Sequence, residues 1–167
     1  GIKLALFPLH VWLPNAYAYA PSVSSAFLAA TATKVSIYVL IRVFYTIFGP
    51  AFSFETLPLD WVLLPLAIIA MFVGSVIAIF EVDLKRMLAY SSVAQIGYII
   101  LGISLASVLG LTGGLLHLFN HALMKGALFL AMGCVFYRLG SVALSDLDGV
   151  GRRMPWTMAA FVIGGLR

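Results

Sequence analysis

Long apolar runs separated by short polar segments dominate the chain, and they predict helices that cross a membrane. A bilayer-spanning helix needs about 20 predominantly apolar residues. The first run covers about 22–48 and the second 61–80. Residues 87–137 form a third run that is too long for one helix, so we predict that it holds two. The pattern therefore predicts four complete transmembrane helices.

Turn-forming residues divide the run from 87 to 137. Thr112 stands among glycines at positions 110, 113 and 114, and such clusters are typical of tight loops. We therefore predict the loop between the third and fourth helices at 109–112. The alternative is one spanning helix followed by a re-entrant hairpin.

A broken helix is predicted before the first run. The segment contains Pro8, Pro14 and Pro21, and prolines at this density break helices and free backbone carbonyls. Broken backbone is tolerated at membrane depth where it is buried or lines a cavity. Lys3 would then lie near the carbonyl end of a first half-helix, where the helix dipole favours a cation. An ordinary interfacial loop with a snorkelling Lys3 is the equal alternative.

Another helix is predicted to begin near Pro155. The uncharged segment from Met154 to Leu166 is too short to span a bilayer. The start of the chain has neither an initiator Met nor a basic region, so it does not resemble a signal peptide. We expect both ends to lie inside helices of a longer protein, with residues 1–167 forming a fragment of one transmembrane transport domain.

The composition supports a membrane protein and excludes other classes. Of the 167 residues, 63% are hydrophobic and 10% charged, and the mean hydropathy is +1.10. Soluble domains carry roughly 25% charged residues, and no short strands of alternating polarity indicate a β-barrel. We therefore predict an all-α integral membrane protein. Its net charge of +4 is not gathered into a nucleic-acid-binding surface, and the single cysteine, Cys134, excludes an internal disulfide.

Cations in the loops predict the orientation. The segments 81–86 and 138–154 carry lysine or arginine, whereas 49–60 and 109–112 carry none. Since successive helices alternate in direction, both cationic segments fall on the same side, and the positive-inside rule places that side in the cytoplasm. Arg42, near the outer end of the first helix, is the exception.

Two lysines lie at predicted membrane depth, Lys34 in the first helix and Lys125 in the fourth. A cation there costs at least about 2.5–3.5 kcal/mol, so each should face protein or water. A structural ion pair is the alternative. However, all six carboxylates of the chain lie in predicted loops or at helix ends: Glu55, Asp60, Glu81, Asp83, Asp146 and Asp148. Because a buried lysine can release its proton near neutral pH and an arginine cannot, we interpret both lysines as proton carriers.

A polar stripe is predicted on the fourth helix. His117, His121 and Lys125 stand four residues apart, so they share one helical face and span about 12 Å along its axis. With Asn120 nearby, the stripe has room for bridging waters. Histidines that only pack against a neighbouring helix are the alternative.

Metal and cofactor sites are not indicated. The two histidines of the stripe have a ligand spacing, but Leu118 stands where a zinc protease helix needs its glutamate. A haem held by two histidines needs them on facing helices, and the third histidine, His10, lies near a predicted membrane boundary. We therefore predict no metal and no cofactor.

Hydrogen-bonding side chains gather at the start of the third helix. Asp83 is a candidate N-cap, and the others are Tyr90, Ser91, Ser92 and Gln95. We interpret them as contacts that hold helices together, with water contact as the alternative.

Three ordered motifs resemble a known family. They are FPLHVWLPNAYAYAPSVSSAFLAATATKVSIYVLIR, DLKRMLAYSSVAQIGY and HLFNHALMKGALFLAMG. Together they resemble the antiporter-like membrane subunits shared by Mrp-type multisubunit Na⁺/H⁺ antiporters and respiratory complex I. The segments ATKVSIYVLIR and NHALMKGALFLAMG look most like the D-type component of the Mrp-type antiporters.

The resemblance implies a parent of about fourteen helices with two inverted halves, of which this chain would hold the start of the second half. It assigns proton translocation to five residues: Lys3, Lys34, His117, His121 and Lys125. Lys3 would pair with a glutamate of an earlier helix, and Lys34 would be the central connecting lysine. The other three would form the histidine/lysine helix of the second half-channel. Some relatives carry a histidine where this chain has Leu28, which favours the D type.

The resemblance thus implies a cation/proton antiport subunit that moves protons along intramembrane lysines and histidines, in exchange for a cation such as Na⁺. The alternative is a proton-pumping subunit of an NADH:quinone oxidoreductase, without a redox centre of its own. The lysines at membrane depth argue against a passive scaffold. Expected partners are other membrane subunits of a hetero-oligomeric complex and the lipid bilayer, with no nucleic acid. The expected location is the bacterial or archaeal plasma membrane, as a multi-pass protein.

Overall fold

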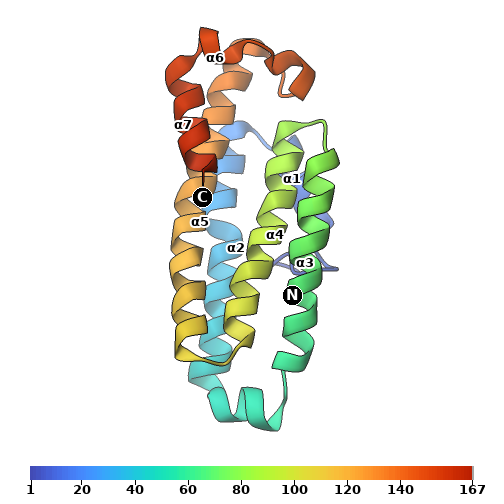
Figure 1. The fold of residues 1–167 in the computed structure, drawn as a ribbon, viewed down its shortest axis with the longest axis vertical. Coiled ribbons are helices and arrows are strands. Elements are labelled where there is room, and N and C mark those ends of the chain that lie inside the picture. The colour runs from blue at the N-terminus through green and yellow to red at the C-terminus, as the bar shows by residue number, and fades with distance from the viewer. Residues whose placement is uncertain (167) are drawn as a thin grey trace.

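The computed structural model describes residues 1–166 and consists of helices joined by short turns, without a β-strand in that range (Figure 1). Its elements in chain order are α1 (Trp12–Tyr19), α2 (Ser22–Ile41), η1 (Arg42–Ile47), η2 (Ala51–Thr56), α3 (Asp60–Phe80), α4 (Leu84–Ser104), α5 (Val108–Leu139), η3 (Leu144–Leu147), α6 (Val150–Arg153) and α7 (Pro155–Gly165). Four helical segments are long and apolar enough to cross a membrane: Ser22–Ile47, Asp60–Phe80, Leu84–Ser104 and Val108–Leu139. The predicted all-α membrane fold with four complete spans is therefore confirmed.

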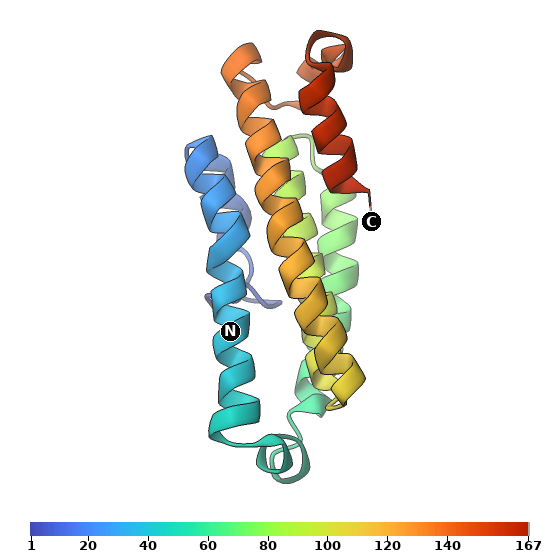
Figure 2. The same ribbon diagram turned by 90° about the vertical axis from the view of Figure 1, so that its left-hand side faces the viewer.

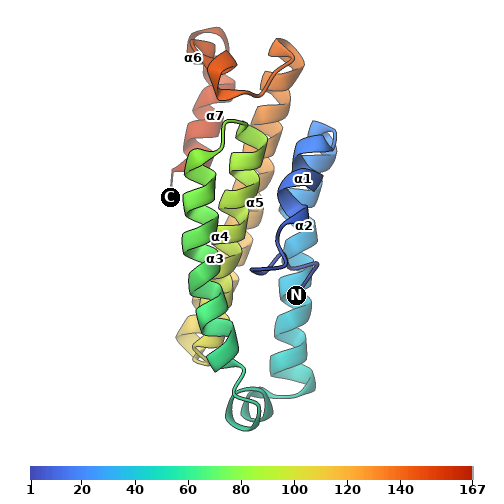
Figure 3. The ribbon, with the colours of Figure 1, turned by 90° about the vertical axis from the view of Figure 1, so that its right-hand side faces the viewer.

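The long helices form one bundle that is vertical in Figure 1. α4 packs against α3 and α5, and α5 packs in turn against α2 and α7. Figures 2 and 3 show α2 on one side of α5 and α7 on the other, with the start of the chain about halfway along the bundle. α4 is the most enclosed span, since 61% of its most apolar stretch is buried, against at most 33% in the other three. The polar side chains of α4 are therefore placed to contact other helices.

The turn between α4 and α5 lies earlier than predicted. The structure places it between Ser104 and Val108, so the predicted loop at 109–112 is wrong and the glycines there belong to α5. Ser107 caps α5, because its Oγ accepts a hydrogen bond from the Gly110 N–H at 3.1 Å. A Cβ on Gly102 of α4 would lie 2.7 Å from the Gly110 carbonyl oxygen. Gly102 and Gly110 therefore allow the two helices to approach closely. Because α4 and α5 are separate spans, the alternative of a re-entrant hairpin is wrong.

The helical structure is interrupted at the start of the chain, as predicted. Residues 1–11 form consecutive tight turns, which lead into the short helix α1. Two hydrogen bonds define these turns, from the Ala5 N–H to the Ile2 carbonyl at 2.9 Å and from the Leu9 N–H to the Leu6 carbonyl at 2.7 Å. Lys3 therefore lies in an exposed turn. Of the two equal alternatives for Lys3, the end of a half-helix is wrong, and the loop is the one that the structure shows.

The helix predicted near Pro155 is present as α7, with the proline in its first turn. Proline suits this position because the first helical N–H groups have no acceptor within the helix. The helix runs back along α5 (Figure 2). It therefore covers part of the α5 surface.

The two cationic segments, 81–86 and 138–154, lie together at one end of the bundle (Figure 3). The Leu84 N–H donates a hydrogen bond to the Val142 carbonyl at 3.1 Å, which joins them directly. The segment 49–60 lies at the opposite end. The prediction that both cationic segments share a side is confirmed, while their placement in the cytoplasm stays a prediction.

Candidate functional site

The predicted polar stripe lies on the buried side of α5. His121 is 0% exposed and Lys125 is 1% exposed, while His117 is partly buried. The rings of His117 and His121 are nearly parallel, with centroids 6.1 Å apart and an interplanar angle of 5°. Asn120 is exposed and does not belong to the buried stripe. The spacing of four residues thus predicted the shared face of the three titratable residues.

Lys125 is held by the neighbouring helix α4. Its Nζ donates a hydrogen bond to the Leu88 carbonyl at 2.7 Å and another to the Ser91 Oγ. The Ser91 hydroxyl itself donates to the Leu88 carbonyl at 2.9 Å. Hydrogen bonds to an ionised group offset part of the cost of removing it from water. The ammonium group therefore lies at the α4–α5 interface, in a defined position.

His117 also contacts α4. Its Nε2 lies 2.7 Å from the Oε1 of Gln95, and its ring meets the edge of Tyr98 at a centroid distance of 6.1 Å. Gln95 and Ser91 are one helical turn apart on α4. Two polar residues of α4 therefore face the polar stripe of α5 along its length.

Ser91 and Gln95 are the site residues that the sequence interpretation missed. It treated them, with Tyr90 and Ser92, as contacts between helices. That description holds for Ser91 and Gln95, but their partners are the titratable residues themselves. Ser92 bonds to the Leu88 carbonyl of its own helix at 2.9 Å, and Tyr90 meets His10. The four-residue spacing of Ser91 and Gln95, equal to that of the stripe, was the available signal.

Lys34 lies in a different interface. It is 7% exposed, and its Nζ donates to the Ala29 carbonyl of its own helix. A cavity of about 300 Å³ adjoins it, between α2 and α5. The cavity is lined by Lys34, Val35, Tyr38, Leu115, Leu118, Phe119 and Ala122. The α5 residues that line this cavity are thus all apolar, although they stand close to the residues of the polar stripe in the sequence.

The carboxylates lie where the sequence predicts. Asp60 begins α3, and Glu81 and Asp83 lie between α3 and α4. The other three, Glu55, Asp146 and Asp148, lie in η2, in η3 and next to η3. None of the six belongs to α2, α4 or α5, the helices that carry Lys34 and Lys125 and their hydrogen-bond acceptors.

The N-terminal turns bring His10, but not Lys3, into the bundle. Lys3 is exposed, whereas His10 is 6% exposed and packs between Phe7 and Tyr90, with ring centroids 5.4 Å and 6.3 Å away. The Nδ1 atom of His10 is buried and has no hydrogen-bond partner among residues 1–166. In the structure as described, Lys3 therefore remains apart from the site at Lys125.

A cavity of about 310 Å³ adjoins Lys125 between α4, α5 and α7. Its polar lining comes from Ser91, Gln95 and Lys125, and Phe161 and Gly165 of α7 line it as well. Each water molecule in a liquid occupies about 30 Å³ and needs two to four polar partners. The cavity therefore has both the room and the polar groups to hold water beside the ammonium group.

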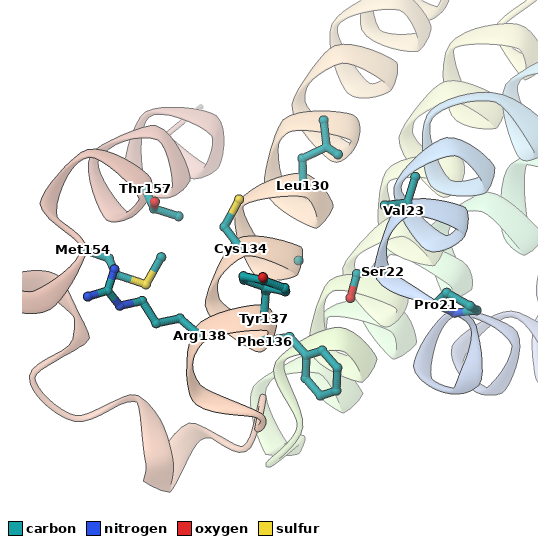
Figure 4. A pocket seen from close by; sticks show the side chains of 11 residues that line it. Pro21, Ser22, Val23, Leu130, Cys134, Phe136, Tyr137, Arg138, Met154 and Thr157 are labelled. Carbon is teal, nitrogen blue, oxygen red and sulfur yellow. The ribbon is translucent and has the colours of Figure 1, made fainter.

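A larger cavity than either of these lies elsewhere. Its volume is about 840 Å³, and it lies beside the cationic end of the bundle, where residues of α5 stand between those of α2 and α7 (Figure 4). Its lining is mainly apolar, with Arg138 as its charged member. It contains none of the five predicted proton carriers, so cavity volume alone does not identify the candidate site.

Comparison with known proteins gives consistent matches. Residues 1–167 match the family described as "NADH:quinone oxidoreductase/Mrp antiporter, TM". The chain is 49% identical to the NADH-quinone oxidoreductase subunit N of Desulforudis audaxviator, over 99% of the chain and 33% of that protein. It is 38% identical to the hydrogenase-4 component B of Escherichia coli, over 99% of the chain and 26% of that protein.

Two solved structures have the same fold. A chain of the Mrp complex from Dietzia sp. superposes with a TM-score of 0.90 and 34% identity, covering 98% of this chain and 30% of that one. A chain of the membrane-bound sulfane sulfur reductase, an archaeal respiratory membrane complex, superposes with a TM-score of 0.88 and 33% identity, covering 98% and 33%. The chain thus spans about a third of the length of these relatives.

Proposed function

Because this chain belongs to the family of transmembrane subunits shared by NADH:quinone oxidoreductases and Mrp antiporters, we propose that it is the proton-conducting part of a longer, multi-pass membrane subunit. Protons are carried along His117, His121 and Lys125 at the α4–α5 interface. Lys34 connects this path laterally, and Lys3 belongs to its entry from the first half of the parent protein.

The observation that carries the proposal is the environment of Lys125. This lysine is 1% exposed in a 32-residue apolar helix, bonds to acceptors of α4 and shares its helix face with two parallel histidine rings. Ionisable residues inside a membrane generally mark ion or proton pathways. Lysine and histidine both exchange protons when their surroundings favour it, and the adjoining cavity has room for water.

The parent protein is proposed to work within a hetero-oligomeric membrane complex. Relatives are named as a subunit of NADH-quinone oxidoreductase and as part of the Mrp complex and of an archaeal respiratory complex. This chain would contribute the start of the second of two inverted halves. The rest of the parent would supply the acidic partner of Lys3.

Two types of complex are candidates. The 49% identity to subunit N of an NADH-quinone oxidoreductase exceeds the 34% identity to a chain of the Mrp complex. It favours a proton-pumping subunit of an electron-transfer complex, which was the alternative in the sequence interpretation. The motif likeness to the D-type component of Mrp antiporters keeps a Na⁺/H⁺ antiporter subunit as the second candidate. Purification of the complex separates them: flavin and iron–sulfur subunits support the first, and antiporter subunits alone support the second.

Lys125→Ala tests the proton path. Alanine packs well in a helix but carries no proton, so proton-coupled transport by the assembled complex should fall by on the order of 10²-fold. Leu123→Ala is the matched control, because Leu123 lies two positions away on α5 and is 60% exposed. Wild-type transport by Lys125→Ala at equal complex content would remove this lysine from the mechanism.

A further inference from the structure

Two polar residues of α4, Ser91 and Gln95, face the titratable stripe of α5 one helical turn apart. We propose that both are positioning residues of the proton path: Ser91 holds the amine of Lys125 in both of its protonation states, and Gln95 holds the ring of His117. The inference rests on the proposed function, and it places the path between α4 and α5 instead of along α5 alone.

The two acceptors of Lys125 differ in chemistry. The Leu88 carbonyl can only accept a hydrogen bond, so it binds the protonated ammonium group and offers nothing to the lone pair of a neutral amine. The Ser91 hydroxyl accepts from the ammonium group, and after rotation about its C–O bond it can donate to the neutral amine. The neutral amine can still donate an N–H to the Leu88 carbonyl, but of the two groups only the Ser91 hydroxyl can also donate to its lone pair, so Ser91 remains a full partner of Nζ before and after the proton leaves.

Gln95 has the same twofold capacity toward His117. Its Oε1 lies 2.7 Å from the imidazole Nε2 and accepts from an Nε2–H group. Rotation of the amide by half a turn presents its NH₂ group instead, which can donate to an unprotonated Nε2. The amide can therefore hold the ring in either tautomer while Nδ1 exchanges protons, and it keeps the ring parallel to that of His121.

Both α4 residues also line the cavity of about 310 Å³ that adjoins Lys125. A proton that leaves His117 passes by way of His121 to the neutral amine of Lys125, which the cavity adjoins. His117 is then neutral and Lys125 charged, and no other group changes its charge. Ser91 and Gln95 neither gain nor lose a proton overall, so their role is to fix the donor and the acceptor.

A matched pair of serines tests the role of Ser91. The hydroxyls of Ser91 and Ser92 both donate to the Leu88 carbonyl at 2.9 Å, but Lys125 bonds to Ser91. In the assembled complex with the full-length parent, Ser91→Ala should lower proton-coupled transport about 2- to 10-fold and displace the pH midpoint of transport. Ser92→Ala should change neither quantity. Ser91→Thr keeps the hydroxyl and should restore both.

Gln95→Leu tests the second contact, because leucine is similar in volume and offers neither a donor nor an acceptor. We expect a lowered rate and a displaced pH midpoint, as for Ser91→Ala. A lowered rate with an unchanged pH midpoint, or no recovery in Ser91→Thr, would indicate a packing effect and overturn the inference. If Ser91→Ala and Gln95→Leu behave like Ser92→Ala while Lys125→Ala is inactive, the positioning roles fail and the proposed function stands. Activity of Lys125→Ala would reject the proposed function itself.

Discussion

Lys34 and Lys125 are both buried lysines in the middle of a transmembrane helix, but the two interfaces that hold them differ. At the α4–α5 interface, Lys125 bonds to two acceptors of another helix, and its cavity has a serine and a glutamine in its wall. At the α2–α5 interface, Lys34 bonds to a carbonyl of its own helix, and the α5 side of its cavity is apolar.

Under the proposed function, this difference gives the two lysines different surroundings for proton transfer. Lys125 is fixed between two helices that also hold the histidines, so a proton can reach it through groups that are already in place. The cavity beside Lys34 meets Leu118 and Ala122 of α5, neither of which can bind a proton or water.

Removing Lys34 should have an effect as large as removing Lys125. Lys34→Ala should lower proton-coupled transport by on the order of 10²-fold, because alanine cannot carry a proton across the α2–α5 interface. Complex assembly should remain, since alanine favours the helix.

Ser36→Ala is the control for Lys34→Ala. The Ser36 hydroxyl donates to the Ala32 carbonyl of the same helix at 3.1 Å, so the variant removes an intrahelical bond but no proton carrier. Transport rates are compared at equal amounts of the protein in membranes. A wild-type rate in Lys34→Ala would confine the path to the α4–α5 interface and remove the lateral connection.

A smaller effect should follow from separating α4 and α5 near their turn. A Cβ on Gly102 would lie 2.7 Å from the Gly110 carbonyl, whereas a Cβ on Gly113 would have no neighbour within 4 Å. Gly102→Ala should therefore destabilise the protein by about 1–3 kcal/mol, and Gly113→Ala should stabilise the helix by up to about 1 kcal/mol. Thermal unfolding of the purified complex measures both. Equal melting temperatures for the two variants would show that this close contact does not hold the interface.

The smallest effect on transport is expected from cysteine substitutions at the two ends of the bundle. In a Cys134→Ser background, Leu57→Cys should react with an impermeant maleimide added from outside, and Ser145→Cys should not, because the cations lie at the end that carries Ser145. Both positions are exposed, so transport should be unchanged. Labelling of Ser145→Cys alone would show that the bundle has the opposite orientation in the membrane.

Run length and helical periodicity predicted much of this architecture. They gave the four spans, the depth of Lys34 and Lys125 and the shared face of the stripe, because each of these depends on local spacing. The loop at 109–112 was misplaced because glycine marks both turns and close helix contacts, and only the packing of Gly102 against Gly110 separates the two.

Contacts between distant segments could not be predicted. Lys85 was counted only as a loop cation, yet it is 5% exposed, donates to the Ala20 carbonyl at 3.3 Å and lies 5.2 Å from the Phe136 ring centroid. Ser91 and Gln95 were identified as polar contacts, but their partners depend on the register of α4 against α5. Register between helices is a property of the packed bundle, and a single helix pattern does not contain it.

In the proposed mechanism, Lys125 exchanges protons and is not merely a fixed charge. Lys125→Arg tests it most directly, because arginine keeps the positive charge but does not release its proton at useful pH. Proton-coupled transport is measured in the assembled complex for lysine, arginine and alanine at position 125, at equal expression. Lys125→Arg should be impaired to nearly the same extent as Lys125→Ala. Full activity with arginine would contradict it and make Lys125 a structural cation.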